Sequence, residues 1–218
     1  SLDRRQRQMC IRDSNEYDMI KPDMTYVESL PEFYEEIKRL QAGAHSKEYI
    51  EHHKALKKCA RDPDVKVIKE LGVCQGGTLA AMMLEHPKVI RGYDIATYYY
   101  NPYKKLFENY AKEHNIDFKY IGMSSLDTNS VYECDLLHID SLHEPDHLMQ
   151  ELRLHGPTVS KYIVFHDTAN FKTSAGLFNV VAKYITEVEQ SWKIIDHYIH
   201  RVGYLSLIHI SEPTRPID

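Results

Sequence analysis

Short runs of β-branched and other apolar residues alternate with amphipathic stretches along most of this 218-residue chain. The apolar runs predict strands at residues 65–71, 89–93, 118–121, 135–140 and 161–165, and an antiparallel pair at 192–199 and 202–205. Apolar residues at helical spacing predict helices at 32–40, 47–60, 78–84, 101–111, 145–154 and 174–189. Alternating strands and helices predict an α/β, Rossmann-like doubly wound fold. Its seven-stranded sheet is mostly parallel with helices on both faces, and its last strand is antiparallel and truncated.

Two local expectations concern helix ends and helix faces. Asn101 and Pro102 form a good N-cap and first-turn pair, so they are expected to open a helix. His52 and His53 are adjacent on the helix predicted at 47–60 and are expected to be solvated.

The two ends of the chain stand apart from the rest. Residues 9–14 and 206–217 resemble translated sequencing-adapter sequence, which is a frequent scar in assembled metagenomic genes. Pro213 and Pro216 also suit neither a strand nor a helix interior. We therefore expect both ends to be artefacts of gene assembly, and the alternative is a genuine disordered tail.

This interpretation divides the chain into four parts. Residues 1–14 are an artefactual leader, and residues 206–218 are an artefactual tail. Residues 15–64 form an N-terminal helical segment or lid, and residues 65–205 form the main domain.

Composition limits the classes of partner. The formal net charge of −5 argues against a nucleic-acid partner, because phosphate binding favours a basic face. The four cysteines form no Cys-x-x-Cys pair, which favours a reduced, cytoplasmic protein without a disulfide framework. No apolar run approaches the ~20 residues that span a bilayer. A small-molecule partner is expected, and a homo-oligomer is left open.

A glycine-rich turn follows the first predicted strand. It begins after Glu70 and has the spacing Gly-x-x-x-Gly-Gly, whereas dinucleotide enzymes have Gly-x-Gly-x-x-Gly. Such a turn lets the backbone approach a nucleotide-like ligand closely, and Glu70 is placed to meet an amino group or a hydroxyl. Asp94 ends the second strand, 22 residues after Gly72, an offset typical of a carboxylate that accepts hydrogen bonds from ribose. The alternative is a tight strand–helix turn with no ligand, and Asp94 as a simple turn residue.

This stretch resembles motif I of class I S-adenosylmethionine (SAM) methyltransferases, which reads acidic-x-Gly-x-x-x-Gly-Gly-Ser/Thr. The resemblance implies SAM as the cofactor and places the segment after the third strand, residues 122–126, near the adenine. The cofactor-binding residues that it implies are Glu70, Gly72, Gly76, Gly77, Thr78, Asp94, Ser125 and Asp140.

Carboxylates and histidines follow the fourth and fifth strands. Asp140 ends one strand, and His166 and Asp167 end the next. Carboxylates at the tips of adjacent parallel strands lie close together and need a cation or a shared proton. A divalent ion with oxygen ligands, such as Mg²⁺, answers this need. His143, three residues after Asp140, is placed to act as the base for a substrate hydroxyl.

The Asp-x-x-His and Phe-His-Asp-Thr segments resemble the metal-dependent small-molecule O-methyltransferases related to macrolide-sugar methyltransferases and the cephalosporin-hydroxylase group, over about residues 65–170. The resemblance implies Asp140 and Asp167 as metal ligands, and His143 as the catalytic base beside Asp140. His166 stands where relatives often carry a second carboxylate. If His166 is a metal ligand, the site accepts Mn²⁺, Fe²⁺ or Zn²⁺ more readily. The alternative is that His166 orients a neighbouring residue. In metal-free relatives, the aspartate at the position of Asp140 lines the cofactor or substrate pocket.

These observations predict a SAM-dependent methyltransferase that acts on a hydroxyl oxygen of a small molecule, such as a sugar or a secondary metabolite. Assistance by Mg²⁺ or Mn²⁺ is left open. Two alternatives remain: a non-catalytic SAM-binding protein, and a NAD-dependent oxidoreductase, which the glycine spacing disfavours.

Overall fold

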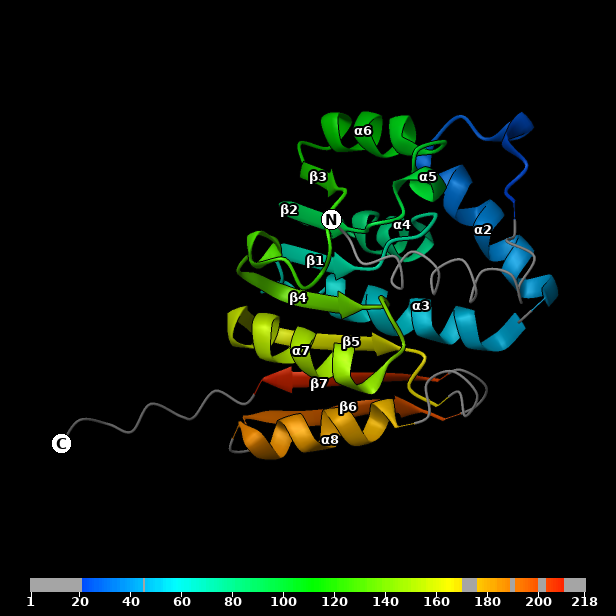
Figure 1. The fold of residues 1–218 in the computed structure, drawn as a ribbon. Coiled ribbons are helices and arrows are strands. Elements are labelled where there is room, and N and C mark those ends of the chain that lie inside the picture. Colours follow the sequence, from blue (N-terminus) through cyan, green and yellow to red (C-terminus); the bar gives the residue numbers. More distant parts are fainter. Residues whose placement is uncertain (1–20, 45, 170–175, 189–190, 200–202, 210–218) are drawn as a thin grey trace.

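In the part of the chain that the structure describes, seven strands form one sheet in the order β3-β2-β1-β4-β5-β7-β6 (Figure 1). The structure is a computed structural model that describes residues 21–44, 46–169, 176–188, 191–199 and 203–209. The strands are β1 (Val67–Leu71), β2 (Val89–Tyr93), β3 (Asp117–Ile121), β4 (Cys134–Ile139), β5 (Val159–His166), β6 (Trp192–Tyr198) and β7 (Tyr204–His209). The α-helices are α2 (Leu30–Ala44), α3 (Ser46–Ala60), α4 (Gly77–Met83), α5 (Thr97–Tyr100), α6 (Lys104–Glu113), α7 (Pro145–His155) and α8 (Leu177–Glu187).

The pairing of the strands confirms the predicted fold class. Strands β3, β2, β1, β4 and β5 pair in parallel, and β7 is antiparallel to both β5 and β6. Residues 206–209, which the sequence assigns to the tail, lie in β7; residues 206–208 pair with β5, and His209 pairs with Trp192 of β6. The predicted leader at 1–14 and the remainder of the tail, 210–218, lie outside the described residues.

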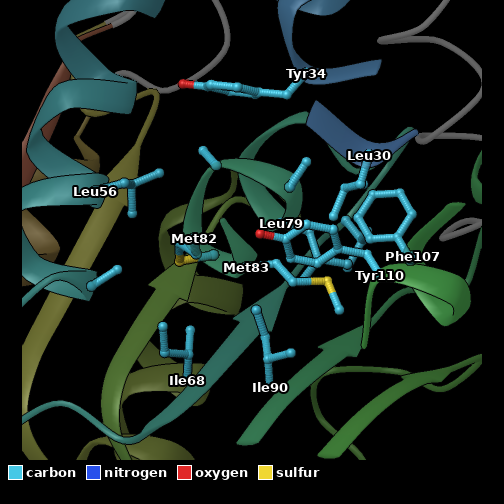
Figure 2. Packing of buried hydrophobic residues seen from close by; sticks show 14 of the residues in the cluster. Leu30, Tyr34, Leu56, Ile68, Leu79, Met82, Met83, Ile90, Phe107 and Tyr110 are labelled. Carbon is cyan, nitrogen blue, oxygen red and sulfur yellow. The ribbon is translucent and has the colours of Figure 1, made fainter. Parts of the chain in front are cut away.

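Helices cover both faces of the sheet, and two hydrophobic clusters fill the space beneath them. In the first cluster, Ile68 and Ile90 point from β1 and β2 toward Leu79 and Met82 of α4 (Figure 2). Helices α2, α3 and α6 contribute to the same cluster. The second cluster joins alternate residues of β1, β4 and β5, such as Leu137, to helices α7 and α8. The two clusters follow from the side-chain alternation of period two along each buried strand.

The same alternation explains where the polar residues at the strand ends lie. Side chains two residues apart in a strand point to the same face of the sheet. Glu70 follows Ile68 in this way, and His138 follows Leu136. The apolar face under α3 and α4 therefore becomes polar near the carboxyl ends of the strands.

Two local predictions were wrong. Asn101 does not cap a helix at its N-terminus: it follows the short helix α5, adopts αR geometry and donates from its backbone N–H to the Thr97 carbonyl at 3.0 Å. Helix α6 begins only at Lys104, because α5 already uses the residues before Asn101. His52 and His53 are not solvated but 0% and 2% exposed, because α3 turns this face toward the sheet.

Candidate active site

The glycine-rich turn leaves β1 directly against the end of β4. Gly72 has a φ of 83°, and a Cβ on it would lie 2.0 Å from the carbonyl oxygen of Asp140. Gly76 has a φ of 92°, and a Cβ there would lie 2.7 Å from the ring of Phe107. Both positions thus require glycine, for the left-handed backbone and for the close approach. The turn and the tip of β4 form one contiguous structure.

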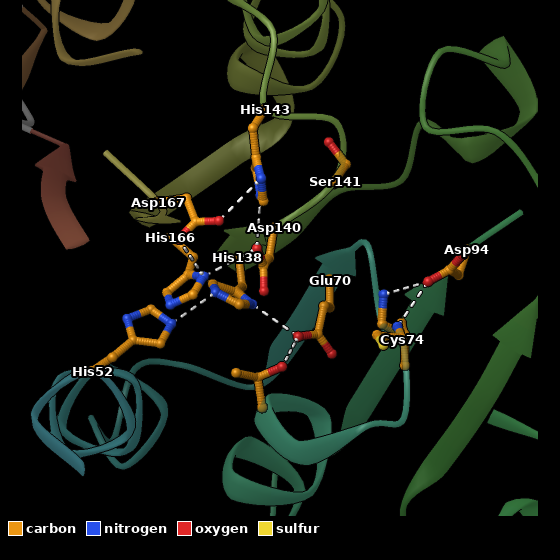
Figure 3. A network of polar contacts seen from close by, with 12 residues as sticks. His52, Glu70, Cys74, Asp94, His138, Asp140, Ser141, His143, His166 and Asp167 are labelled. Carbon is orange, nitrogen blue, oxygen red and sulfur yellow. Dashed lines mark hydrogen bonds and ion pairs between the residues drawn. The ribbon is translucent and has the colours of Figure 1, made fainter. Parts of the chain in front are cut away.

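Asp94, at the end of β2, organises this turn. Its Oδ2 accepts hydrogen bonds from the backbone N–H groups of Val73, at 2.9 Å, and Cys74, at 2.7 Å (Figure 3). Its Oδ1 accepts one from the N–H of Ala96 at 2.6 Å. The carboxylate therefore holds the backbone of the turn, whereas its predicted contact with ribose stays a prediction.

Glu70 lies under the turn and is completely buried. Its Oε1 accepts hydrogen bonds from the Thr78 hydroxyl, at 2.5 Å, and from Nδ1 of His138, at 2.8 Å. Burial raises the pKa of the Glu70 carboxyl, although both hydrogen bonds oppose this. Its Oε2 has no hydrogen-bond partner among the described residues. Glu70 and Thr78 thus tie β1 to α4 and β4, and their predicted role in cofactor binding stays a prediction.

Three histidines continue this network beneath α3. Nε2 of His138 lies 3.1 Å from Nε2 of His52, whose ring packs against that of His166 with centroids 4.6 Å apart. His138 lies in β4, His166 ends β5 and His52 belongs to α3, so three separate segments meet here (Figure 3). Burial, and then the neighbouring imidazoles, lower the pKa of His52 well below its usual range, so this ring is neutral.

Asp140, His143, His166 and Asp167 form one cluster, as predicted from the strand ends. His143 bridges the two carboxylates: its Nε2 lies 3.2 Å from Oδ1 of Asp140, and its Nδ1 lies 3.0 Å from Oδ2 of Asp167 (Figure 3). Nδ1 of His166 lies 3.2 Å from Oδ1 of Asp140 and 3.4 Å from Oδ1 of Asp167. The two imidazoles thus separate two carboxylates that would otherwise repel each other.

The charges in this cluster shift its protonation. Burial disfavours charged imidazoles, but the carboxylates of Asp167 and Asp140 raise the pKa of His143 well above its usual value. The same carboxylates raise the pKa of His166 to about 9. Burial opposes ionisation of Asp140, yet His166 and His143 hold its pKa well below the usual range. In this arrangement both histidines are cations at neutral pH and Asp140 is ionised.

Three of these residues offer a donor set for a metal ion. One ligand atom each from Asp140, His166 and Asp167 lies within 4.8 Å of the others. Oδ1 of Asp167 is buried and accepts no hydrogen bond from the described residues, although it forms the 3.4 Å ion pair with Nδ1 of His166. Asp167 also has a φ of 54°, a left-handed conformation that is uncommon outside glycine and that clusters at functional sites. These residues fit a divalent cation.

Ser125, predicted near the adenine, belongs to a second polar network on the opposite face. Its hydroxyl lies 3.2 Å from Nε2 of His147, which lies 3.2 Å from Oε1 of Glu151 on the next turn of α7. Ser141, directly after Asp140, donates to the same oxygen of Glu151. The network thus links the segment after β3 to the segment after β4, and contact of Ser125 with a cofactor stays a prediction.

Comparisons with known proteins bear on the fold. No family model matches the chain, and no curated sequence matches it. Among solved structures, a candidate O-methyltransferase from Klebsiella pneumoniae is 17% identical, with 95% of this chain and 100% of that chain covered and a TM-score of 0.55. The O-methyltransferase NovP is 12% identical, with 74% and 81% covered and a TM-score of 0.54. N-methyltransferase NodS from Bradyrhizobium japonicum WM9 is 11% identical, with 75% and 97% covered and a TM-score of 0.54.

The fold is that of class I methyltransferases. At these identities the likeness concerns the fold alone, so the residues of the site carry the argument on function. Within the part of the chain that the structure describes, no helix is long and apolar enough to cross a membrane.

Sequence reasoning missed two histidines of the site. His138 lies two residues before Asp140 in a strand, so alternation places both side chains on the same face. The sequence alone therefore could have placed His138 on the face of Asp140. The structure adds that His138 lies beside Glu70 in the β1–β4 register. His52 had no such signal, because only the packing of α3 brings it to the strand ends.

Proposed function

We propose that this protein is a SAM-dependent methyltransferase that transfers a methyl group to a hydroxyl oxygen of a small molecule. The observation that carries the proposal is the direct contact between the glycine turn at Gly72 and the tip of β4 at Asp140. These two segments lie where the strand order turns from β2-β1 to β4-β5, the point at which open α/β sheets bind ligands.

The cofactor assignment rests on the turn and on Asp94. A carboxylate offers about four acceptor positions, and Asp94 uses three of them on backbone N–H groups. Within the described residues, its Oδ1 accepts only from the N–H of Ala96, so this oxygen keeps capacity for a ribose hydroxyl. Bound SAM supplies a methyl group on a positively charged sulfur.

The cluster beside the turn provides the acceptor chemistry. Methyl transfer to a hydroxyl breaks the sulfur–carbon bond, forms an oxygen–carbon bond and releases the hydroxyl proton. His143 is the candidate to accept that proton, and Asp140 and Asp167 hold its ring from both sides. His143 must first lose the proton that these carboxylates stabilise on it.

Asp140, His166 and Asp167 would hold a divalent cation, with His166 releasing its proton on ligation. The cation would supply positive charge that lowers the pKa of the acceptor hydroxyl. A set of two carboxylates and one imidazole suits Mn²⁺, Fe²⁺ or Zn²⁺ better than an all-oxygen set does, and Mg²⁺ remains compatible with the carboxylates.

Titration calorimetry tests the cofactor class. The protein is titrated with SAM, S-adenosylhomocysteine and NAD, each in EDTA and in added Mg²⁺ or Mn²⁺. We expect micromolar binding of S-adenosylhomocysteine and no heat with NAD. If folded protein binds neither SAM nor S-adenosylhomocysteine, the proposal is contradicted. Binding of NAD alone would favour the oxidoreductase.

A second experiment separates an enzyme from a non-catalytic SAM-binding protein. S-adenosylhomocysteine release is followed with panels of hydroxyl and amine acceptors for the wild type and for Asp167→Ala. An O-methyltransferase turns over a hydroxyl acceptor and loses turnover in the variant, while both proteins bind S-adenosylhomocysteine equally. Turnover of amine acceptors alone would contradict an oxygen acceptor. A loss of S-adenosylhomocysteine affinity in Asp167→Ala would contradict a cofactor site that is separate from the Asp167 cluster.

A further inference from the structure

His52 is buried at the candidate metal site, although the proposed function assigns it no role. Helix α3 carries it from a distant part of the sequence to the ends of β4 and β5. Its side chain is 0% exposed, and its ring centroid lies 4.6 Å from that of His166 at an interplanar angle of 42°. Tyr204 of β7 lies on it as well, with centroids 5.5 Å apart. His52 thus forms part of the wall against which the His166 ring rests.

A hydrogen-bond chain fixes the plane of the His52 ring in turn. Nδ1 of His138 lies 2.8 Å from Oε1 of the Glu70 carboxyl, and this contact fixes the plane of the His138 ring. Nε2 of His138 lies 3.1 Å from Nε2 of His52, so a hydrogen bond between these nitrogens ties the His52 ring to His138. The Thr78 hydroxyl anchors the far end of the chain on Glu70. The orientation of His52 is therefore set by residues of β1, β4 and α4.

The burial of an imidazole here is costly for packing alone. Nδ1 of His52 has no hydrogen-bond partner among the described residues, and a buried nitrogen without a partner destabilises the fold. An apolar side chain would fill this position without that cost. The combination of an oriented imidazole and a neighbouring candidate ligand therefore points to a task beyond filling space.

We propose that His52 is a positioning residue for His166, which it holds with Nδ1 directed at the carboxylates of Asp140 and Asp167. A fixed ring orientation strengthens metal binding by an imidazole, and the outer-shell groups that fix it typically matter by about 10–100-fold in affinity. Rotation of the His166 ring would carry Nδ1 away from both carboxylates, and the His52 ring restricts this rotation from one side. The inference rests on the proposed metal-assisted function.

The test compares Mn²⁺ affinities by titration calorimetry in the wild type, His52→Leu and His52→Phe. Leucine fills the space but removes the aromatic face and the N–H donor, so we expect Mn²⁺ to bind about tenfold or more weakly. Phenylalanine restores an aromatic face and is expected to recover part of that loss. The visible absorption of bound Co²⁺ gives a second readout, and we expect it to change in His52→Leu, because it reports ligand geometry.

His53→Leu is the matched control. His53 is equally buried on the same helix, but its Nδ1 lies 3.3 Å from the Tyr34 hydroxyl, and its ring stacks on Tyr34. We expect Mn²⁺ affinity in this variant to stay within about twofold of the wild type. Equal Mn²⁺ affinity in the wild type and in folded His52→Leu would overturn the inference. Equal losses in His52→Leu and His53→Leu would do the same, because they would indicate a general effect of α3.

S-adenosylhomocysteine binding, measured on the same samples, distinguishes failure of the inference from failure of the proposed function. A wild type that binds S-adenosylhomocysteine but not Mn²⁺ overturns the role of His52 and leaves the cofactor class standing. A wild type that binds Mn²⁺ but not S-adenosylhomocysteine contradicts the methyltransferase proposal, and the His52 comparison then still decides the inference.

Discussion

Replacing Gly72 by alanine tests the contact between the turn and the cluster. The added Cβ would lie 2.0 Å from the Asp140 carbonyl oxygen, where real Cβ atoms stay beyond 3.0 Å. The backbone at Asp140 must therefore move by about 1 Å, and such overpacking typically costs about 1–3 kcal/mol. Alanine at a φ of 83° adds roughly 1–2 kcal/mol of backbone strain. We expect Gly72→Ala to lose roughly 2–5 kcal/mol of unfolding free energy.

Gly77→Ala is the matched control in the same turn. A Cβ on Gly77 would lie 3.1 Å from a side-chain methyl of Ile37, which can give way, and Gly77 has no left-handed φ. We expect its unfolding free energy to stay within about 1 kcal/mol of the wild type. Urea unfolding followed by circular dichroism measures both variants.

Metal binding provides the functional readout of the same substitution. A shift of about 1 Å at Asp140 exceeds the tolerance of roughly 0.5 Å within which a ligand set must be held. Gly72→Ala should therefore weaken Mn²⁺ binding, whereas Gly77→Ala should not. An unfolding free energy of Gly72→Ala within about 0.5 kcal/mol of the wild type would refute the packing argument.

Three further predictions concern buried polar groups. Burial, reinforced by Lys69, lowers the pKa of His155 to about 4, so the unfolded chain binds its proton first and stability falls as the pH drops from about 6.5 toward 4. At pH 5 this lowers the free energy of unfolding by about 2 kcal/mol. In His155→Gln, the free energies of unfolding in urea at pH 7 and pH 5 should therefore differ by about 2 kcal/mol less than in the wild type. Thr78→Val removes the hydroxyl that donates to buried Glu70 and should cost about 1–3 kcal/mol in urea unfolding, whereas Thr78→Ser should retain most of it. Asp167→Asn removes a carboxylate that raises the pKa of His143, so an NMR titration should show this pKa falling, and an unchanged value would contradict the assigned ion pair.

Much of the fold follows from local patterns in the sequence. The β-branched run before Gly72 and the apolar run before Asp140 each bury a strand between two helical layers, so each reads as continuous hydrophobic sequence. Chain order and strand–helix alternation then place their carboxyl ends at one edge of the sheet. The β7 strand was harder to delimit, because its second half, residues 206–209, lies in the segment that we set aside on compositional grounds.

The candidate site was predictable only where it lies on the strands. Asp140, His166 and Asp167 end adjacent parallel strands, so their proximity follows from topology. The burial of His52 depends on the rotation of α3 about its own axis and on its position over β5. Neither is encoded in the helical spacing of that segment, in which polar and apolar residues are mixed. The helix that opens after Asn101 was misjudged for a similar reason, because a preceding turn of helix occupied its capping position.

Several unsatisfied buried atoms at the carboxyl edge of the sheet argue that this edge binds a ligand. Among the buried side-chain atoms that have no hydrogen-bond partner in the described residues are Glu70 Oε2, His52 Nδ1 and Thr168 Oγ1. They belong to residues at or facing the ends of β1 and β5, and each costs roughly 1–3 kcal/mol in a fold whose total stability is about 5–15 kcal/mol. A network selected only for stability would pair these atoms or replace them with apolar groups. Their persistence beside two carboxylates and two cationic imidazoles is the physical ground for treating the cluster as a binding site rather than as a structural ion pair.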